Sequence, residues 1–208
     1  MKKFFTLFLA LVASLQLFAY DTQIDGIYYN IYNGDNPYAE VTYLYSQSSS
    51  NSSAYQGEVV IPSSIVYNGT TYPVTSIGSY AFYYCSSLNS VTIPNSVTSI
   101  GSSAFYYCSS LISVTIPNSV TSIGSSAFRS CSSLTSVTIP NSVTSIGSNA
   151  FRSCSSLTSI TIPNSVTYIG NEAFCNCSSL LSIYVNGSYV TPAILSYYVF
   201  SNTNNAPI

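Results

Sequence analysis

The 208-residue sequence contains no histidine and no tryptophan, and it carries very little charge. Lysine, arginine, aspartate and glutamate together make up 5% of the chain, and after Glu58 the only carboxylate is Glu172. A Ser-His-Asp arrangement, a histidine metal site and a pair of acid/base carboxylates therefore all lack their parts. These absences predict a protein that is not an enzyme, with no catalytic residues, no cofactor and no metal site.

The chain has even fewer positively charged residues, four, than carboxylates, six. Lys2 and Lys3 lie in an N-terminal segment that we expect to be removed, which leaves Arg129 and Arg152 against six carboxylates, a net charge of −4. Binding to nucleic acid needs clustered cations. We therefore expect no nucleic-acid partner.

The first 19 residues have the features of an export signal. Two lysines are followed by an apolar stretch over residues 4–12, and Ala19 is a small residue suited to cleavage. The sequence predicts a signal peptide over residues 1–19, a secreted or cell-surface protein, and no membrane contact beyond this signal. Nothing in the chain indicates an oligomeric state.

The rest of the chain is dominated by one 23-residue unit written four times from Leu88 onward. Leu111, Leu134 and Leu157 open the later copies, and residues 111–133 differ from 134–156 at only Ile112/Thr135 and Ser126/Asn149. Self-similarity at a fixed period of this length indicates a solenoid, in which each unit packs on its neighbours.

Each copy predicts short local elements. Val91 to Ile93 alternate as in a strand, Pro94 ends it, and Val97 with Ile100 anchors a second short extended segment. Gly101 follows, where a positive φ would let the chain reverse. The apolar positions 104, 105, 108 and 111 have the spacing of one face of a short helix.

The pattern Leu-x-x-Val-x-Ile-Pro-x-x-Val-x-x-Ile-Gly-x-x-Ala-Phe-x-x-Cys at residues 88–108, repeated to Cys177, resembles the BspA-like leucine-rich repeats of bacterial surface proteins. The resemblance covers roughly residues 58–185. It implies a leucine-rich repeat solenoid with a parallel β-sheet on one side and short helical turns on the other. It also implies surface display and binding or adhesion.

We expect four segments along the chain. The signal peptide (1–19) precedes a β-rich N-terminal cap (20–57), the solenoid (58–185) and an irregular C-terminal end (186–208) that is expected to be an incomplete cap. In the cap, two β-rich runs flank a turn cluster at residues 33–37. In the first repeat, Asn68-Gly69 predicts a small protruding hairpin that contacts the cap. Phe200 is expected to be a displaced equivalent of Phe174.

Five of the six cysteines share one repeat position: Cys85, Cys108, Cys131, Cys154 and Cys177. In a stacked column their Cβ atoms would be at least about 4.8 Å apart, beyond the usual disulfide range. We favour buried thiols that pack like small apolar groups over disulfides. Cys175 takes the position of Arg152 in the repeat and is expected to be exposed.

The variable positions of the repeat are the candidate binding surface, and they form two adjacent columns. Its residues are Tyr83, Tyr84, Tyr106, Tyr107, Arg129 and Arg152. Exposed tyrosines and arginines commonly anchor protein interfaces, and tyrosine rings can stack on sugars. The alternative is that they only stack on each other, with Arg129 over Tyr106 as a cation–π pair.

A second candidate surface is rich in hydroxyl groups. Thr92, Thr115, Thr138, Thr161 and Tyr184 are the outward residues of successive strands, and serines two positions earlier flank them. This ladder would suit a glycan or an extended chain, or it is simply the solvated face of a sheet. Together these patterns favour a protein that mediates protein–protein interaction or adhesion, with a protein of a host or neighbouring cell, or a glycan, as partner. A carbohydrate-binding or purely structural surface-layer protein is the alternative.

Overall fold

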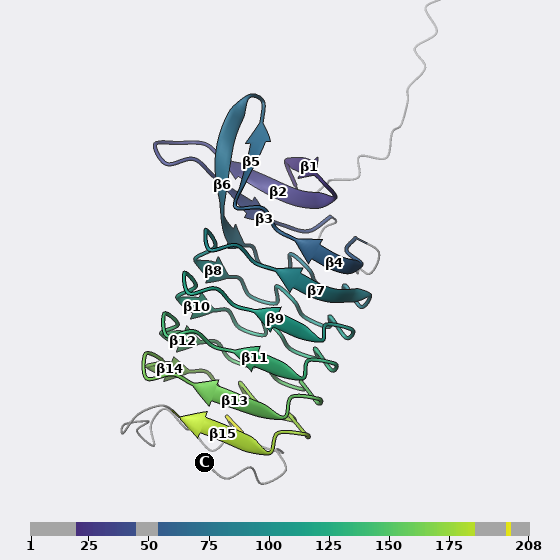
Figure 1. The fold of residues 1–208 in the computed structure, drawn as a ribbon, viewed down its shortest axis with the longest axis vertical. Coiled ribbons are helices and arrows are strands. Elements are labelled where there is room, and N and C mark those ends of the chain that lie inside the picture. Colours follow the sequence, from purple (N-terminus) through teal and green to yellow (C-terminus); the bar gives the residue numbers. More distant parts are fainter. Residues whose placement is uncertain (1–19, 45–53, 186–198, 201–208) are drawn as a thin grey trace, which may run out of the picture.

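The computed structural model shows an elongated stack of rungs with strands of different direction at its N-terminal end (Figure 1). The structure describes residues 20–44, 54–185 and 199–200. The predicted signal peptide, and most of the predicted C-terminal end, lie outside the described residues.

One side of the stack is a six-stranded parallel sheet, in which each copy contributes one strand. The alternation of Val91 and Thr92 predicts this strand, and Val91 is buried whereas Thr92 is exposed. Val114 pairs with Val91 and with Val137, so partners lie 23 residues apart in the sequence. The strands, in sheet order, are β4 (Gly57–Val60), β7 (Leu88–Thr92), β9 (Ser113–Thr115), β11 (Ser136–Thr138), β13 (Ser159–Ile162) and β15 (Ser182–Val185).

A second, nine-stranded sheet lies on another side of the rungs, and the strands that the repeats contribute to it pair in parallel and are only two residues long. Val97 and Ile100 mark this segment in the sequence, and both are buried. The two-residue strands are β8 (Ser99–Ile100), β10 (Ser122–Ile123), β12 (Ser145–Ile146) and β14 (Tyr168–Ile169). They pair in register with one another, and β8 pairs with the end of β6 (Thr70–Ile77). The predicted second extended segment is therefore confirmed.

The third side consists of turns, and the short helix expected there is wrong. The predicted apolar positions are buried, with Ala104 and Phe105 fully enclosed. However, Ser103 and Tyr107 have φ of 55° and 62°, which no α-helix tolerates. The backbone N–H of Phe105 instead donates to the carbonyl of Ala127 in the next rung (2.7 Å). Bonds to the next rung, made by every second N–H, alternate with three-residue turn bonds such as that from Tyr106 to Ser103, so the continuous bonding of an α-helix is absent from this turn.

The glycine at the end of each two-residue strand is required by close packing, not by a reversal of the chain. Gly101 has no left-handed φ, contrary to expectation, whereas a Cβ atom at this position would lie 2.5 Å from the backbone nitrogen of Ser79. Gly124 meets the backbone of Gly101 and Ser102 in the same way. A side chain is excluded here because adjacent rungs touch through their backbones.

The interior is organised around one column of phenylalanine rings. Phe82, Phe105, Phe128, Phe151 and Phe174 stack with centroid separations of 4.8 to 5.3 Å and interplanar angles of 2 to 7°. Phe200 continues the column 5.3 Å from Phe174, and this confirms its prediction as the displaced equivalent. The backbone N–H of Phe174 also donates to the carbonyl of Val199.

The N-terminal cap is an antiparallel β region that joins the second sheet. Its strands are β1 (Thr22–Ile24), β2 (Ile27–Tyr32) and β3 (Tyr38–Val41), and the predicted turn cluster separates β2 from β3. Strand β3 pairs in parallel with β6, so the cap continues the solenoid through shared hydrogen bonds.

The predicted hairpin in the first repeat is confirmed. It consists of β5 (Ser64–Tyr67) and β6, which pair in antiparallel register around Asn68 and Gly69. Both turn residues have positive φ (50° and 78°), as this type of two-residue turn requires. The hydroxyl of Tyr72 in β6 donates to Asn33 Oδ1 (2.8 Å), so the hairpin contacts the cap.

Candidate functional site

The turn side carries a cluster of aromatic residues that we call the tyrosine ladder: Tyr83, Tyr84, Tyr106 and Tyr107. Tyr83 stacks on Tyr106 (5.1 Å, 23°) and Tyr84 stacks on Tyr107 (4.8 Å, 15°). The two columns also touch, since Tyr83 meets Tyr84 edge-on at 4.7 Å. Tyr107 is the most open of the four and is 44% exposed. The sequence columns are therefore brought together as a single aromatic surface that is only partly covered.

The ladder is ordered because equivalent residues of successive rungs share one backbone conformation. Tyr84 and Tyr107 have φ of 59° and 62°, and their backbone N–H groups donate to the carbonyls of Tyr106 and Arg129 in the next rung (2.8 Å each). Equal dihedrals at equivalent positions make the side chains leave the rungs in the same direction. The stacking follows from the rung spacing of about 4.8 Å, close to the separation at which aromatic rings pack.

The two arginines continue one column of the ladder, and they have different partners. The guanidinium of Arg129 lies over the Tyr106 ring, 5.5 Å from its centroid, as the cation–π alternative predicted. Arg152 forms an ion pair with Glu172 and also donates to Asn149 Oδ1. In the described part of the chain no other ion pair is present, so Arg129 is the one cation there without a carboxylate partner.

The surroundings of the ladder raise the pKa of two of its phenols. Burial, followed by the neighbouring Tyr106 and Tyr107, raises the pKa of Tyr84, while Arg129 acts in the opposite direction. Burial and the adjacent tyrosines likewise raise the pKa of Tyr83. Both phenols are therefore neutral hydrogen-bonding groups at neutral pH.

The cysteine column lies inside the stack, next to the phenylalanine rings. Cys85, Cys108, Cys131, Cys154 and Cys177 are free thiols and are fully buried. From the second copy onward each Sγ donates to the carbonyl of the phenylalanine 26 residues earlier, for example Cys108 to Phe82 at 3.0 Å. Burial raises the pKa of Cys85 and of Cys177 to about 12. These thiols are structural groups with suppressed nucleophilicity.

Cys175 is buried, not exposed as the sequence suggested. It is 4% exposed although it occupies the column position of Arg152. Its side chain ends one atom beyond Cβ, whereas arginine extends outward, and the segment at Val199 packs on the same rung through the bond from Phe174. Across the described residues no group of three histidine, cysteine or carboxylate side chains could hold a metal ion.

The hydroxyl-rich face lies on the outer surface of the six-stranded sheet. Thr92, Thr115 and Thr138 are exposed, and Tyr184 extends the column with 58% of its surface open. Val60 stands at the other end of this column because it pairs with Thr92, and it is 66% exposed. The strands of this face pair in register. The face carries no charge except that of Glu58, which pairs with Ser90 at the N-terminal edge of the sheet.

Two features were not found from the sequence. The first is a threonine column at the start of the two-residue strands, where Thr121 donates to the carbonyl of Thr98 through both its N–H and its Oγ1. The 23-residue recurrence of threonine was the signal. These N–H and hydroxyl donors are used in hydrogen bonds between rungs, so we assign this column a role in stabilising the stack and no role in binding.

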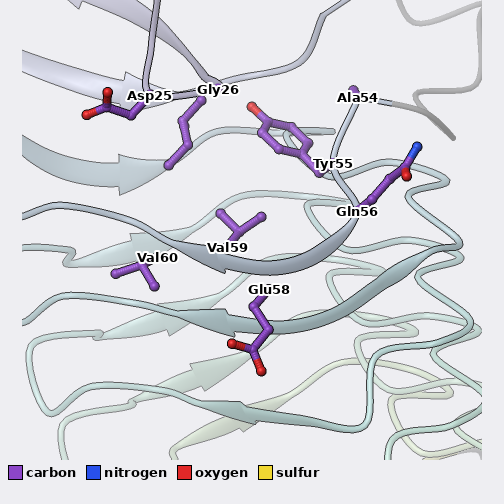
Figure 2. Close-up of a pocket in the computed structure, with 9 residues that line it drawn as sticks. Asp25, Gly26, Ala54, Tyr55, Gln56, Glu58, Val59 and Val60 are labelled. Atoms are coloured by element: carbon purple, nitrogen blue, oxygen red, sulfur yellow. The ribbon is translucent and has the colours of Figure 1, made fainter.

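The second is a pocket of about 230 Å³ between the cap and the first rung, lined in part by Asp25, Tyr55 and Glu58. Figure 2 shows the two carboxylates at separate edges of it. The Tyr55 hydroxyl is already used, because it accepts from the N–H of Tyr28 and donates to the carbonyl of Thr42. No sequence motif joins these residues, which come from two separate segments, residues 25–27 and 54–60.

Comparison with known proteins decides the family. The profile described as "BspA type Leucine rich repeat region" matches residues 75–206, more than half of the chain, in six copies. The chain belongs to this family. The BspA-type repeats thus account for the parallel sheets, the turn side and the phenylalanine and cysteine columns described above. The comparison with curated proteins finds no match.

Solved structures of other leucine-rich repeat proteins resemble this BspA-type chain. A leucine-rich repeat protein from Bacteroides ovatus is 38% identical with a TM-score of 0.69, and the match covers 81% of this chain and 41% of that one. The Treponema pallidum leucine-rich repeat protein is 32% identical with a TM-score of 0.66, covering 78% and 70%. This chain therefore spans about two fifths of the length of the Bacteroides ovatus protein.

A third structure supports the fold alone. The pneumococcal vaccine antigen PcpA is 22% identical with a TM-score of 0.55, and the match covers 79% of this chain and 49% of the antigen. In the part of this BspA-type chain that the structure describes, no helix has the length and apolar character to cross a membrane.

Proposed function

We propose that this BspA-type chain is an exported, non-enzymatic recognition module that attaches to a macromolecule at the cell surface through the tyrosine ladder. The partner is a protein of a host or neighbouring cell, or a glycan. The observation that carries the proposal is the ladder itself: four tyrosines held in fixed stacking geometry on a rigid stack while part of their surface stays open to solvent. Pre-ordered aromatic rings lose little conformational entropy on binding.

Charge supports the same proposal. The described residues outside the cap carry few charges, and Arg152 is neutralised by Glu172. Long-range electrostatic steering should therefore be weak, and attachment would depend on contact area, hydrogen bonding and any short-range contact to Arg129, which has no carboxylate partner among the described residues.

The experiment compares the two candidate faces in one attachment assay. The mature chain is immobilised and tested against whole cells, extracellular matrix proteins and a glycan array. A Tyr83→Ala/Tyr106→Ala variant is matched by a Thr115→Ala/Thr138→Ala variant on the outer face of the six-stranded sheet, and circular dichroism verifies that both fold. We expect the tyrosine variant to lose attachment and the threonine variant to keep it. The reverse pattern would move the site to the hydroxyl-rich face, and attachment by both variants would refute the proposal.

A further inference from the structure

The two columns of the tyrosine ladder end differently. In the column that contains Tyr83 and Tyr106, the next place is filled by Arg129, whose guanidinium covers the Tyr106 ring. In the column that contains Tyr84 and Tyr107, the next residue is Ser130, and its side chain is too short to cover a ring. Within the described residues Tyr107 makes ring contacts with Tyr84 and Tyr106 alone. The ring face of Tyr107 that looks toward the next rung is thus left open.

The backbone shows that this open place is equivalent to the places that rings occupy. Tyr84, Tyr107 and Ser130 have φ of 59°, 62° and 61°, and Ser153 follows with 61°. The N–H of Ser130 donates to the carbonyl of Arg152 (2.8 Å), as the N–H of Tyr107 does to Arg129. A ring that stood above Ser130 would therefore continue the stack at the same spacing, 4.8 Å between Tyr84 and Tyr107.

The surroundings of this place combine one cation with neutral hydroxyls. Arg129 is adjacent to Ser130 in the chain and has no carboxylate partner among the described residues. Ser130 and Ser153 are half-buried, and among the described residues their hydroxyls make no hydrogen bond to another residue. A ligand here meets an aromatic face, a positive charge and two free hydroxyl groups.

We propose that this place binds a pyranose ring that carries one anionic substituent, such as the carboxylate of a uronic or sialic acid residue in an acidic glycan. The sugar ring stacks on Tyr107 where a third tyrosine would stand, its carboxylate pairs with Arg129, and its hydroxyls bond to Ser130 and Ser153. Aromatic rings stack on apolar ring faces, and carboxylates form strong charge-assisted bonds to arginine. This inference rests on the proposed function, because it names the ligand of the same surface.

The backbone of the turn side argues against an extended peptide as the occupant. A peptide that adds to a surface as a strand needs unpaired N–H and carbonyl groups. Here the N–H of Tyr107 is bonded to the next rung, and the N–H groups of Tyr106 and Cys108 are bonded within their own turn. Binding must therefore come from side chains, and this favours a ring ligand that is rich in hydroxyls.

The test uses calorimetric titration of the mature chain with four sugars. Oligogalacturonate is compared with its methyl ester, which keeps the ring and removes the charge, and sialyllactose is compared with lactose, so that uronic and sialic sources are distinguished. We expect at least one acidic sugar to bind about tenfold or more tightly than its neutral counterpart, the size of one charge-assisted contact. Arg129→Gln should abolish this difference while weak binding remains.

The decisive variant fills the open place. Ser130→Tyr extends the ring column at a backbone conformation that Tyr107 already adopts, so the chain should fold. The uncovered ring face then lies one rung further on, next to Arg152, which is already paired with Glu172, so the preference for the acidic sugar should be lost. Tyr107→Ala removes the stacking face and serves as a second variant if Ser130→Tyr does not fold. Tyr168→Ala, at an exposed tyrosine in β14, is the control and should bind as the unmodified chain does.

Two results would overturn the inference. Either equal affinity of the unmodified chain for the acidic and neutral sugars, or a preference for the acidic sugar in Ser130→Tyr as large as in the unmodified chain, contradicts it. If no sugar binds while the chain still attaches to a protein through Tyr83 and Tyr106, the acidic-glycan inference fails and the proposed attachment function stands. If the chain attaches to neither proteins nor glycans, both fail.

Discussion

Tyr55 closes the phenylalanine column by packing its ring on Phe82, with 4.5 Å between the ring centroids and an interplanar angle of 49°. Tyr55 is 2% exposed, and its hydroxyl joins the N–H of Tyr28 to the carbonyl of Thr42 in the cap. One side chain therefore connects the cap to the repeat interior through both its ring and its hydroxyl.

Changes at Tyr55 should separate these two contributions. Tyr55→Phe keeps the ring but removes the buried hydrogen bonds to the N–H of Tyr28 and the carbonyl of Thr42, and should lower the free energy of unfolding by about 1–3 kcal/mol. Tyr55→Ala also leaves a cavity and should cost about 3–5 kcal/mol. Urea denaturation followed by circular dichroism measures both, with Tyr168→Phe as an exposed control. Equal losses for the two Tyr55 variants would show that the hydroxyl carries the whole effect.

The glycine column makes a prediction with a matched control. In Gly124→Ala the new Cβ would lie 2.6 Å from the backbone of Gly101 and Ser102, so adjacent rungs must separate, at a cost of about 1–3 kcal/mol. Gly34→Ala adds a Cβ where nothing lies within 4 Å, and it should be neutral or slightly stabilising. Thermal unfolding of the two variants checks this. A Gly124→Ala variant as stable as the parent would contradict the close contact between rungs.

The buried thiols predict a loss of stability at alkaline pH. Burial raises the pKa of Cys85 and Cys177 to about 12 from an ordinary value of 9.0, so the folded state holds these protons more tightly than the unfolded state. Their contribution is complete below about pH 9 and is lost as the pH rises toward 12. The free energy of unfolding should fall by up to about 1.4 kcal/mol per pH unit for each such thiol.

Urea denaturation at several pH values from 8 to 11 measures this slope. Cys85→Ala should make the slope shallower, because one of the titrating groups is removed. A slope identical to that of the unmodified chain would show that Cys85 is not protected from ionisation.

The cysteine column also predicts the reactivity of the native protein. At pH 8 a thiol reagent should label none of the buried cysteines of the folded chain at a rate comparable to free cysteine, because the reactive thiolate is suppressed and enclosed. In denaturant all six should react. Mass spectrometry without reductant counts the labelled thiols, and a denatured chain with fewer than six would reveal disulfides.

The ion pair on the turn side should contribute little to stability. Arg152 and Glu172 are 29% and 36% exposed, and such pairs are worth about 0–1 kcal/mol. Arg152→Ala should change the free energy of unfolding by less than about 1 kcal/mol, and high salt should reduce the difference further. A loss above 2 kcal/mol in urea denaturation would contradict a screened surface pair.

Much of the fold could be predicted because the same apolar positions recur in every copy of the repeat. Val91, Phe105 and Cys108 recur at fixed spacing, and the structure buries all of them. The geometry of the turn side could not be predicted in the same way. Apolar spacing of four residues fits a helix, and it fits equally well a turn in which left-handed residues, here Ser103 and Tyr107, interrupt the right-handed backbone. Only the hydrogen bonds between rungs distinguish them.

The candidate site was partly visible in the sequence. The columns of tyrosine and arginine follow from the period, and the pairing of Arg129 with Tyr106 follows from their alignment. The burial of Cys175 could not be predicted, because it depends on residues near Val199 that lie outside the period. The open face of Tyr107 could not be predicted either, because it depends on how the short side chain of Ser130 lies relative to the ring in the folded stack.

The in-register pairing of residues 23 positions apart gives the molecule a modular length. An additional copy inserted after Cys154 would meet the same carbonyls, rings and thiols that its neighbours meet, and would lengthen the stack by one strand spacing, about 4.8 Å. The aromatic end of the surface would keep its shape while the distance to the C-terminal end grew. Gain or loss of whole copies can therefore change the length of such a protein without altering its aromatic surface.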